Sequence, residues 1–126
     1  MADIFHSAEP IYLQLAERIK RQIVRGELQL GEKLPSVRDM ALKANVNPNT
    51  VQRTYRELEG LKIVESKRGQ GTFVTVDERV LQAIREEMKE TEISHFVQVM
   101  REMGYSDDEI KAGLDSYLTE KGASEQ

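Results

Sequence analysis

Apolar residues recur every four positions near the start of the chain, which is the period of a helix with one buried face. Polar side chains occupy the opposite face of this segment. Pro10 fits the first helical position because its φ is already helical, and Gly26 is a typical stop just after the last turn. The pattern predicts a core helix from Pro10 to Arg25. Its apolar stripe comprises Ile11, Leu15, Ile19 and Ile23, and Tyr12, Ala16 and Val24 widen it.

Two shorter amphipathic segments follow. Ser36 precedes Asp39 by three residues, a weaker relative of the capping box, so a helix should start there. The turn Asn45–Asn47 ends in a residue that can cap the next helix, with Pro48 in its first position, and that helix should reach about Glu59. The pattern predicts a helix-turn-helix. The residues expected in its core are Leu28, Leu30, Leu34, Val37, Met40, Ala41, Val51, Tyr55 and Leu58.

A two-stranded hairpin is predicted next. Leu61–Ser66 and Thr72–Val76 are β-prone runs joined by a polar loop. Gly69 and Gly71 allow positive φ, so this loop can turn sharply and approach another backbone closely.

Two further helices are predicted after the hairpin. The first spans Asp77 to Met103, with an interruption of its apolar period at Lys89–Glu92 where a kink or register shift is expected. Gly104 ends it, and Ser106 with Glu109 forms a capping box for the last helix. The apolar positions of both are Val80, Leu81, Ile84, Met88, Ile93, Phe96, Val97, Met100, Met103, Ile110, Leu114, Tyr117 and Leu118.

Charge is unevenly divided along the 126 residues. Residues 1–76 carry twelve Lys/Arg against nine Asp/Glu, for a net charge of +3, whereas residues 77–126 carry six against thirteen, for −7. The side of the molecule that meets a polyanion should therefore lie in the first part, with the acidic part directed away from it. The split predicts two modules with different partners.

Several function classes are disfavoured. Without cysteine there is no disulfide framework, thiolate metal site or cysteine nucleophile. His6 and His95 have no partner at metal-ligand spacing, and no nucleophile–base or carboxylate pair stands out. No apolar run approaches the length of a membrane helix, and the start lacks a secretory signal. We therefore expect no enzyme, no cofactor, no metal and no membrane partner, and a cytoplasmic location.

The second helix of the helix-turn-helix carries side chains that suit a DNA groove. Asn49, Thr50 and Gln52 stand near its N-terminus, where a recognition helix meets base edges. Amides can pair with adenine, and a threonine methyl can touch thymine. Arg53 can read guanine or hold a phosphate.

Backbone contacts are expected on either side of that helix. Ser36 and the free N–H groups beside it form a phosphate anchor, and Arg38 in the same first turn is placed for a phosphate or a groove edge. Lys67 and Arg68 at the hairpin tip would reach the backbone or the minor groove. Together these features predict binding to double-stranded DNA.

Five motifs stand together in this part of the chain: Pro10-Ile11-Tyr12, Pro35-Ser36-Val37-Arg38, Val46-Asn47-Pro48-Asn49-Thr50-Val51, Tyr55-Arg56-Glu57-Leu58-Glu59 and Arg68-Gly69-Gln70-Gly71-Thr72-Phe73-Val74. With them the sequence resembles the winged-helix domain of GntR-type bacterial transcription regulators over residues 8–76, and in particular the short YtrA-like branch. The resemblance implies a homodimeric repressor binding a short palindromic operator, with transporter genes as candidate targets, and a small C-terminal part that mainly dimerises. It also implies that Arg38, Asn49, Thr50, Gln52, Arg53 and Gly69 approach DNA.

One position departs from the family pattern. Such proteins usually place a glycine just after the recognition helix, about where Lys62 stands, whereas this chain has Gly60 two residues earlier. Either the helix ends sooner, or Lys62 or a neighbour adopts the left-handed conformation that glycine favours.

The fold class expected is mainly α with a small β-hairpin: a winged helix-turn-helix at 1–76 followed by a two-helix dimerisation module at 77–126. Two helices cannot enclose a sizeable core, so their apolar stripes must pack on the winged helix, on a second copy, or on both. The methionines could instead line a groove for a small-molecule effector, whose identity the sequence does not give. The residues expected to dimerise are Leu81, Ile84, Met88, Phe96, Met100, Leu114 and Leu118.

A winged helix can also serve as a protein-docking module without DNA. A docking helix would more often present apolar residues where this chain has Asn49, Gln52 and Arg53. The polar set favours DNA.

Overall fold

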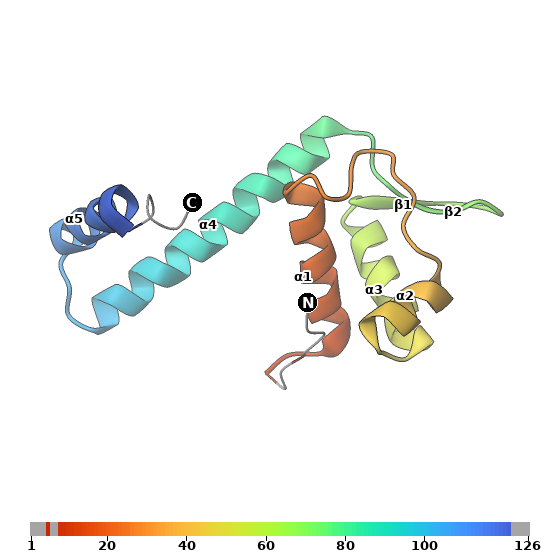
Figure 1. Ribbon diagram of the computed structural model, residues 1–126, viewed down its shortest axis with the longest axis horizontal. Coiled ribbons are helices and arrows are strands. Elements are labelled where there is room, and N and C mark those ends of the chain that lie inside the picture. The colour runs from red at the N-terminus through yellow and green to blue at the C-terminus, as the bar shows by residue number, and fades with distance from the viewer. Residues whose placement is uncertain (1–4, 6–7, 122–126) are drawn as a thin grey trace. The chain divides into compact units, whose positions relative to one another are not determined.

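The computed structural model describes residue 5 and residues 8–121 (Figure 1). His6 lies outside these residues. The chain divides into two compact units, Met1–Arg85 and Glu86–Gln126, and each is described by itself.

Helix α1 (Ile11–Val24) forms one wall of the first unit. Pro10 stands just outside it, with an extended backbone (ψ 143°), so the helix begins one residue later than the proline suggested. Gly26 has a φ of 85° and ends the helix region as expected. Leu15, Ile19 and Ile23 are buried, and α1 packs along α3 (Figure 1).

Helices α2 (Val37–Ala44) and α3 (Pro48–Gly60) form the predicted helix-turn-helix. The Ser36 hydroxyl accepts a hydrogen bond from the N–H of Asp39 at 3.1 Å, and the Asn47 side chain accepts one from the N–H of Asn49 at 2.7 Å. Both predicted caps are therefore confirmed. Asn45 adopts the left-handed conformation that ends α2, which asparagine tolerates better than most residues.

The end of α3 settles the two alternatives raised by the displaced glycine. The helix continues through Gly60, and Lys62 takes the left-handed conformation with a φ of 66°. The N–H of Ile63 then donates to the carbonyl of Leu58, as in a helix terminus. A lysine thus occupies a backbone position that favours glycine.

Strands β1 (Val64–Lys67) and β2 (Gly71–Val74) form the antiparallel wing. β1 begins three residues later than predicted because the helix terminus extends through Lys62. The segment 31–34 lies along the other edge of β2. The N–H of Leu34 donates to the carbonyl of Thr72, and that of Val74 donates to the carbonyl of Glu32, both at 2.8 Å.

One hydrophobic core holds these elements together. All the helix-turn-helix residues expected in the core are buried or half-buried against it. Leu81 and Ile84 from the start of α4 also pack against this core. Its fully buried members include Ile19, Leu34, Val51, Leu58, Ile63, Val64 and Val74.

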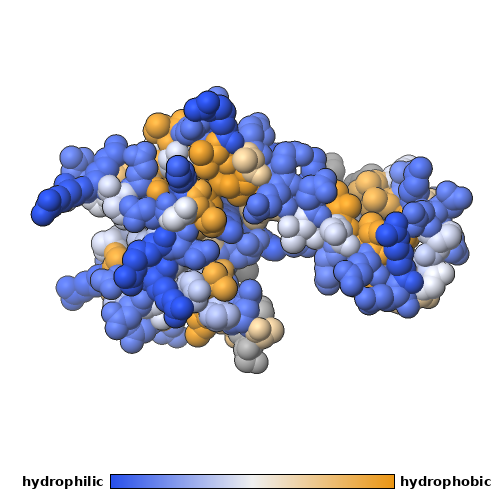
Figure 2. Space-filling model, turned by 180° about the vertical axis from the view of Figure 1, so that it is seen from behind, coloured by the Kyte–Doolittle hydropathy of each residue, from blue (hydrophilic) through white to orange (hydrophobic). Residues whose placement is uncertain are grey.

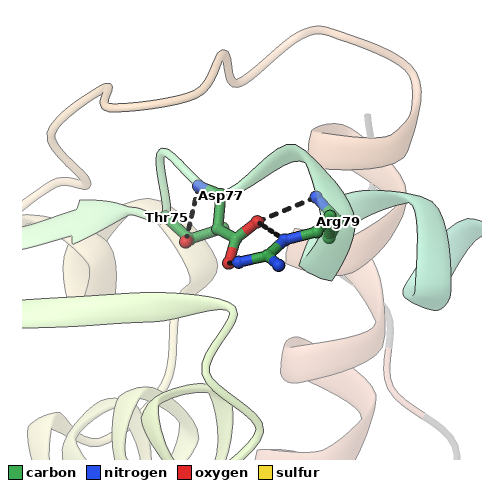
Figure 3. Close-up of polar contacts among 3 residues, drawn as sticks. All are labelled: Thr75, Asp77 and Arg79. Atoms are coloured by element: carbon green, nitrogen blue, oxygen red, sulfur yellow. Dashed lines mark hydrogen bonds and ion pairs between the residues drawn. The ribbon is translucent and has the colours of Figure 1, made fainter.

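A polar turn links β2 to α4 (Glu78–Glu102) (Figure 3). The N–H of Asp77 donates to the buried Thr75 hydroxyl at 3.1 Å, and the Asp77 carboxylate accepts from both the backbone and the guanidinium of Arg79. The Arg79 side chain holds the pKa of Asp77 below its ordinary value. The helix continues through Lys89–Glu92, so the irregular apolar period there does not divide it into two helices.

The second unit contains the rest of α4, α5 (Asp107–Ser116) and a π-helical turn, Tyr117–Lys121. Ser106 and Glu109 form the predicted capping box at the start of α5. Arg101 makes two hydrogen bonds of 3.0 Å to the Asp107 carboxylate. Within the described part of this unit, Ile110 is the only buried residue.

Candidate nucleic-acid interface

Helix α3 is fixed from two sides by hydrogen bonds as well as by its apolar face. The hydroxyl of Thr54, which is fully buried, lies 3.1 Å from the carbonyl of Tyr12 on α1 and 2.9 Å from that of Thr50. The Tyr55 hydroxyl donates to the carbonyl of Pro35 at 2.7 Å. Burial raises the pKa of Tyr55 to about 12, so this phenol remains a donor at neutral pH. The orientation of α3 is therefore defined before any partner arrives.

The opposite face of α3 presents the side chains expected to read DNA. Asn49, Gln52 and Arg53 are exposed, and Thr50 is half-buried. Exposed polar groups on a rigidly held helix meet the requirement for direct readout of base edges.

Two directions can be distinguished on this face. The Arg53 guanidinium lies over the ring of Tyr12, 4.0 Å from its centroid. Gln52 instead lines a cleft of ≈ 310 Å³ on the side of the wing, together with Arg56 and Thr72. Arg53 and Gln52, which the sequence placed in one set, thus serve the two flanks of the helix.

The N-terminus of α2 lies at the same cleft, where Val37 is a lining residue. Ser36 and Arg38 are exposed on either side of Val37. The Ser36 hydroxyl accepts from the N–H of Asp39. The first N–H groups of a helix have no partner within the helix, and such groups are the ones an anion site uses.

The wing presents its cations at the tip. Lys67, Arg68 and Gly69 are exposed, and the N–H of Gln70 donates to the carbonyl of Lys67 to close the turn. The ammonium of Lys67 lies 4.8 Å from the centroid of the Phe73 ring. Gly69 has a φ of 76°, which explains why the tip needs a glycine.

The roles of two residues near this surface were missed by the sequence analysis. Tyr12 was assigned only to the core, although its ring carries Arg53. Lys33 pairs with Phe73 across a single β-bridge, and its side chain lies against Gly71. These contacts join segments about forty residues apart, and no local signal marks them.

The second unit exposes an apolar surface (Figure 2). Among the residues expected to dimerise, Phe96, Leu114 and Leu118 are 40%, 44% and 60% exposed. Met100 is half-buried within the chain. The other apolar residues exposed here are Ile93, Val99, Met103, Tyr105 and Tyr117.

Comparison with known proteins gives the family. Residues 11–74, from α1 to the end of β2, match the family described as bacterial regulatory proteins, gntR family. The chain belongs to the GntR family. As a member, it is a transcription regulator with a DNA-binding helix-turn-helix domain.

Two GntR relatives from Bacillus subtilis illustrate the match. The HTH-type transcriptional regulator YhcF is 44% identical over 97% of this chain and all of its own length. The HTH-type transcriptional repressor YtrA is 39% identical over 67% of this chain and 69% of its own. The predicted YtrA-like relationship is confirmed.

Solved GntR structures share the fold. A GntR family transcriptional regulator from Listeria monocytogenes is 35% identical, covering 89% of this chain and 98% of its own, with a TM-score of 0.84. The DNA-binding domain of AraR, solved in complex with operator ORX1, is 25% identical over 57% of this chain and 93% of its own, with a TM-score of 0.54. The predicted winged helix-turn-helix with C-terminal helices is confirmed.

Neither a metal cluster nor a membrane span is found among residues 5 and 8–121. No group of three or more histidine or acidic side chains is arranged to hold a metal ion. No helix in this part of the GntR chain is both long and apolar enough to cross a bilayer.

Proposed function

We propose that this chain is a homodimeric repressor that binds a short palindromic operator. The observation that carries the proposal is the row of exposed polar side chains on α3, Asn49, Gln52 and Arg53, between a capped helix N-terminus and a basic wing tip. The remaining contacts are assigned to Ser36, Arg38, Thr50, Lys67, Arg68 and Gly69.

The division of labour among these residues follows from their chemistry. Amide and guanidinium groups on α3 can pair with base edges and so supply sequence preference. Ser36, Arg38, Lys67 and Arg68 reach phosphates, which position the protein without reading sequence. The complex of the AraR DNA-binding domain with operator ORX1 supports this use of the fold.

The second unit supplies the dimer. Phe96, Leu114 and Leu118 expose apolar surface that a second copy would cover. A two-fold dimer presents two recognition helices to half-sites about one helical turn apart, which accounts for a palindromic operator. We also assign Leu81, Ile84, Met88 and Met100 to the dimer-forming set. Leu81 and Ile84 are only partly buried by the winged-helix core on which they pack.

Repression is supported by YtrA of Bacillus subtilis, whose name describes it as a repressor. A repressor of this architecture needs only to occupy its operator, for which a DNA-binding unit and a dimer-forming unit suffice. Transporter genes are the proposed targets.

The proposal is tested by selecting duplexes from a randomised library with the full-length protein and measuring its mass in solution by sedimentation. We expect an inverted repeat and a complex of two chains per duplex. Selection of a non-symmetric sequence by a single chain would contradict the proposal. A matched control carries Asn49→Ala and Gln52→Ala together, which should lose the selected sequence while remaining dimeric.

A further inference from the structure

The first turn of α1 is attached to the recognition helix at two neighbouring points. The backbone carbonyl of Tyr12 faces the buried hydroxyl of Thr54 at 3.1 Å. The ring of Tyr12 lies beneath the Arg53 guanidinium, 4.0 Å from carbon Cζ to the ring centroid. The hydrogen bond that joins α1 to α3 therefore uses the backbone of Tyr12. The contact described for its half-buried ring is the one with Arg53.

The stacked geometry has a consequence for the guanidinium. A planar cation lying on an aromatic face keeps its N–H groups at its edge, where they remain available to acceptors. A free arginine side chain must lose rotamer freedom when it binds, whereas a stacked one has already lost much of it. Arg53 is exposed, so its edge is open to a partner arriving at α3.

We propose that Tyr12 is a positioning residue for DNA recognition, holding the Arg53 fork on the flank of α3 nearest α1 for a pair of acceptor oxygens or nitrogens on the DNA. Such a pair is offered either by the edge of a guanine or by a phosphate. The inference rests on the proposed DNA-binding function, and it assigns a role in recognition to the helix that precedes the helix-turn-helix.

The experiment is a double-mutant cycle on the full-length protein. The probe is a duplex selected with the unaltered protein, and a duplex of unrelated sequence measures nonspecific binding. Y12L removes the ring, Y12F keeps it, R53A removes the cation, and R53K keeps the charge without the planar fork. Thermal unfolding of each variant checks folding, and Y12M replaces Y12L if Y12L does not fold.

Stacking predicts that Tyr12 acts only through Arg53. Y12L should weaken binding to the selected duplex by about 3- to 30-fold, the range expected for a cation–π contact. It should have no further effect in the R53A background, and Y12F should retain near-normal affinity. R53K should behave like Y12L, because an ammonium offers no planar fork. As a matched control, F73L removes the ring beneath Lys67 on the wing, and its effect should add to that of R53A.

Comparing the selected and unrelated duplexes shows whether Arg53 contacts a guanine or a phosphate. If Arg53 contacts a guanine, Y12L should relax the base preference at one position of each half-site. If Arg53 contacts a phosphate, Y12L should weaken binding to all duplexes equally and lower the salt dependence of the affinity. Equal loss from Y12L with and without Arg53, or no loss at all, would overturn the role of Tyr12. An R53A variant with normal binding would overturn it as well, while leaving DNA binding itself intact. Failure to select any duplex would contradict the proposed function instead.

Discussion

The Lys33 side chain lies across the backbone of Gly71: a Cβ atom at position 71 would stand 2.7 Å from Cε of Lys33. Gly71 also has a φ of 123°, a conformation that other L-residues rarely adopt. The first residue of β2 is therefore restricted to glycine chiefly by its own backbone, because the end of the flexible Lys33 side chain can move away from an added Cβ atom at little cost.

We expect Gly71→Ala to destabilise the first unit by about 1–3 kcal/mol, the usual cost of a strained backbone position. Urea unfolding gives the value. Adding Lys33→Ala removes the close contact and leaves the strain, so the double variant should recover only a small part of the loss. Full recovery would show that the contact with Lys33, and not the backbone, imposes the glycine.

We expect Lys62→Gly to stabilise the first unit, in contrast to Gly71→Ala. Lys62 has a φ of 66° at the end of α3, where the steric cost falls on any residue with a Cβ atom. Glycine there should raise the free energy of unfolding by about 1 kcal/mol. Lys62→Ala is the matched control, since it removes the charge and keeps the Cβ. A gain from alanine as large as that from glycine would attribute the effect to the lysine side chain.

The buried phenol of Tyr55 predicts a dependence of stability on alkaline pH. Burial raises its pKa from 10.0 to about 12, so the folded state favours the neutral form. This contribution to stability is complete below pH 10 and is lost as the pH rises from 10 to 12. Tyr55→Phe should remove that part of the decline.

At neutral pH, Tyr55→Phe should cost about 1 kcal/mol, because the Pro35 carbonyl loses its donor. Denaturant midpoints of the two proteins across this pH range provide the measurement. Profiles that run parallel between pH 10 and pH 12 would assign the titration to another group.

Changes on α3 and on the wing should affect binding differently. Gln52→Ala removes a side chain that can pair with a base, so it should cost about 1–3 kcal/mol and relax sequence preference. Lys67→Ala and Arg68→Ala should weaken binding to all duplexes and lower the salt slope by about one each. Titrations of selected and unrelated duplexes at two salt concentrations separate the two patterns. An altered base preference in the wing variants alone would reverse these assignments.

Cutting the chain after Arg85 should separate DNA contact from pairing of chains. This fragment keeps Leu81 and Ile84, which pack on the core, and the hydrogen bond from the Arg85 side chain to the Val24 carbonyl. It carries fourteen Lys/Arg against eleven Asp/Glu, a net charge of +3. We expect a folded monomer with weak, salt-sensitive DNA binding.

Loss of the second recognition helix should lower affinity for a palindromic duplex by about 10²- to 10⁴-fold, since tethering raises effective concentration. Sedimentation and titration of the fragment beside the full chain measure both properties. A fragment that remains dimeric would place the dimer contact within residues 1–85.

The features predicted correctly from sequence are those encoded by neighbouring residues. The caps at Ser36 and Asn47 depend on side chains two or three positions from the N–H groups they accept. The same holds for Ser106 and Glu109. The position of Lys62 was foreseen as one of two alternatives, because a helix end without a nearby glycine must place another residue in the left-handed region.

The features missed depend on segments distant in the chain. The bridge between Lys33 and Phe73 and the stack of Arg53 on Tyr12 join residues about forty positions apart. An amphipathic pattern assigns Tyr12 to a buried face but does not identify the cation above it. Helix α4 continues through Lys89–Glu92 for a local reason instead. Its residues there are good helix formers, so an interrupted apolar stripe need not end the helix.

Backbone hydrogen bonds join residues 31–34 to β2. The part of the chain between them, which contains α2 and α3, is therefore a loop whose two ends are held side by side. The helices inside it are anchored by buried residues such as Met40, Val51 and Leu58, while Asn49 and Gln52 are exposed. The residues that hold α2 and α3 in place are therefore not the ones exposed for contact with DNA. Outward-facing positions can be grafted from one relative to another, so that operator choice can diverge while the scaffold that presents it stays the same.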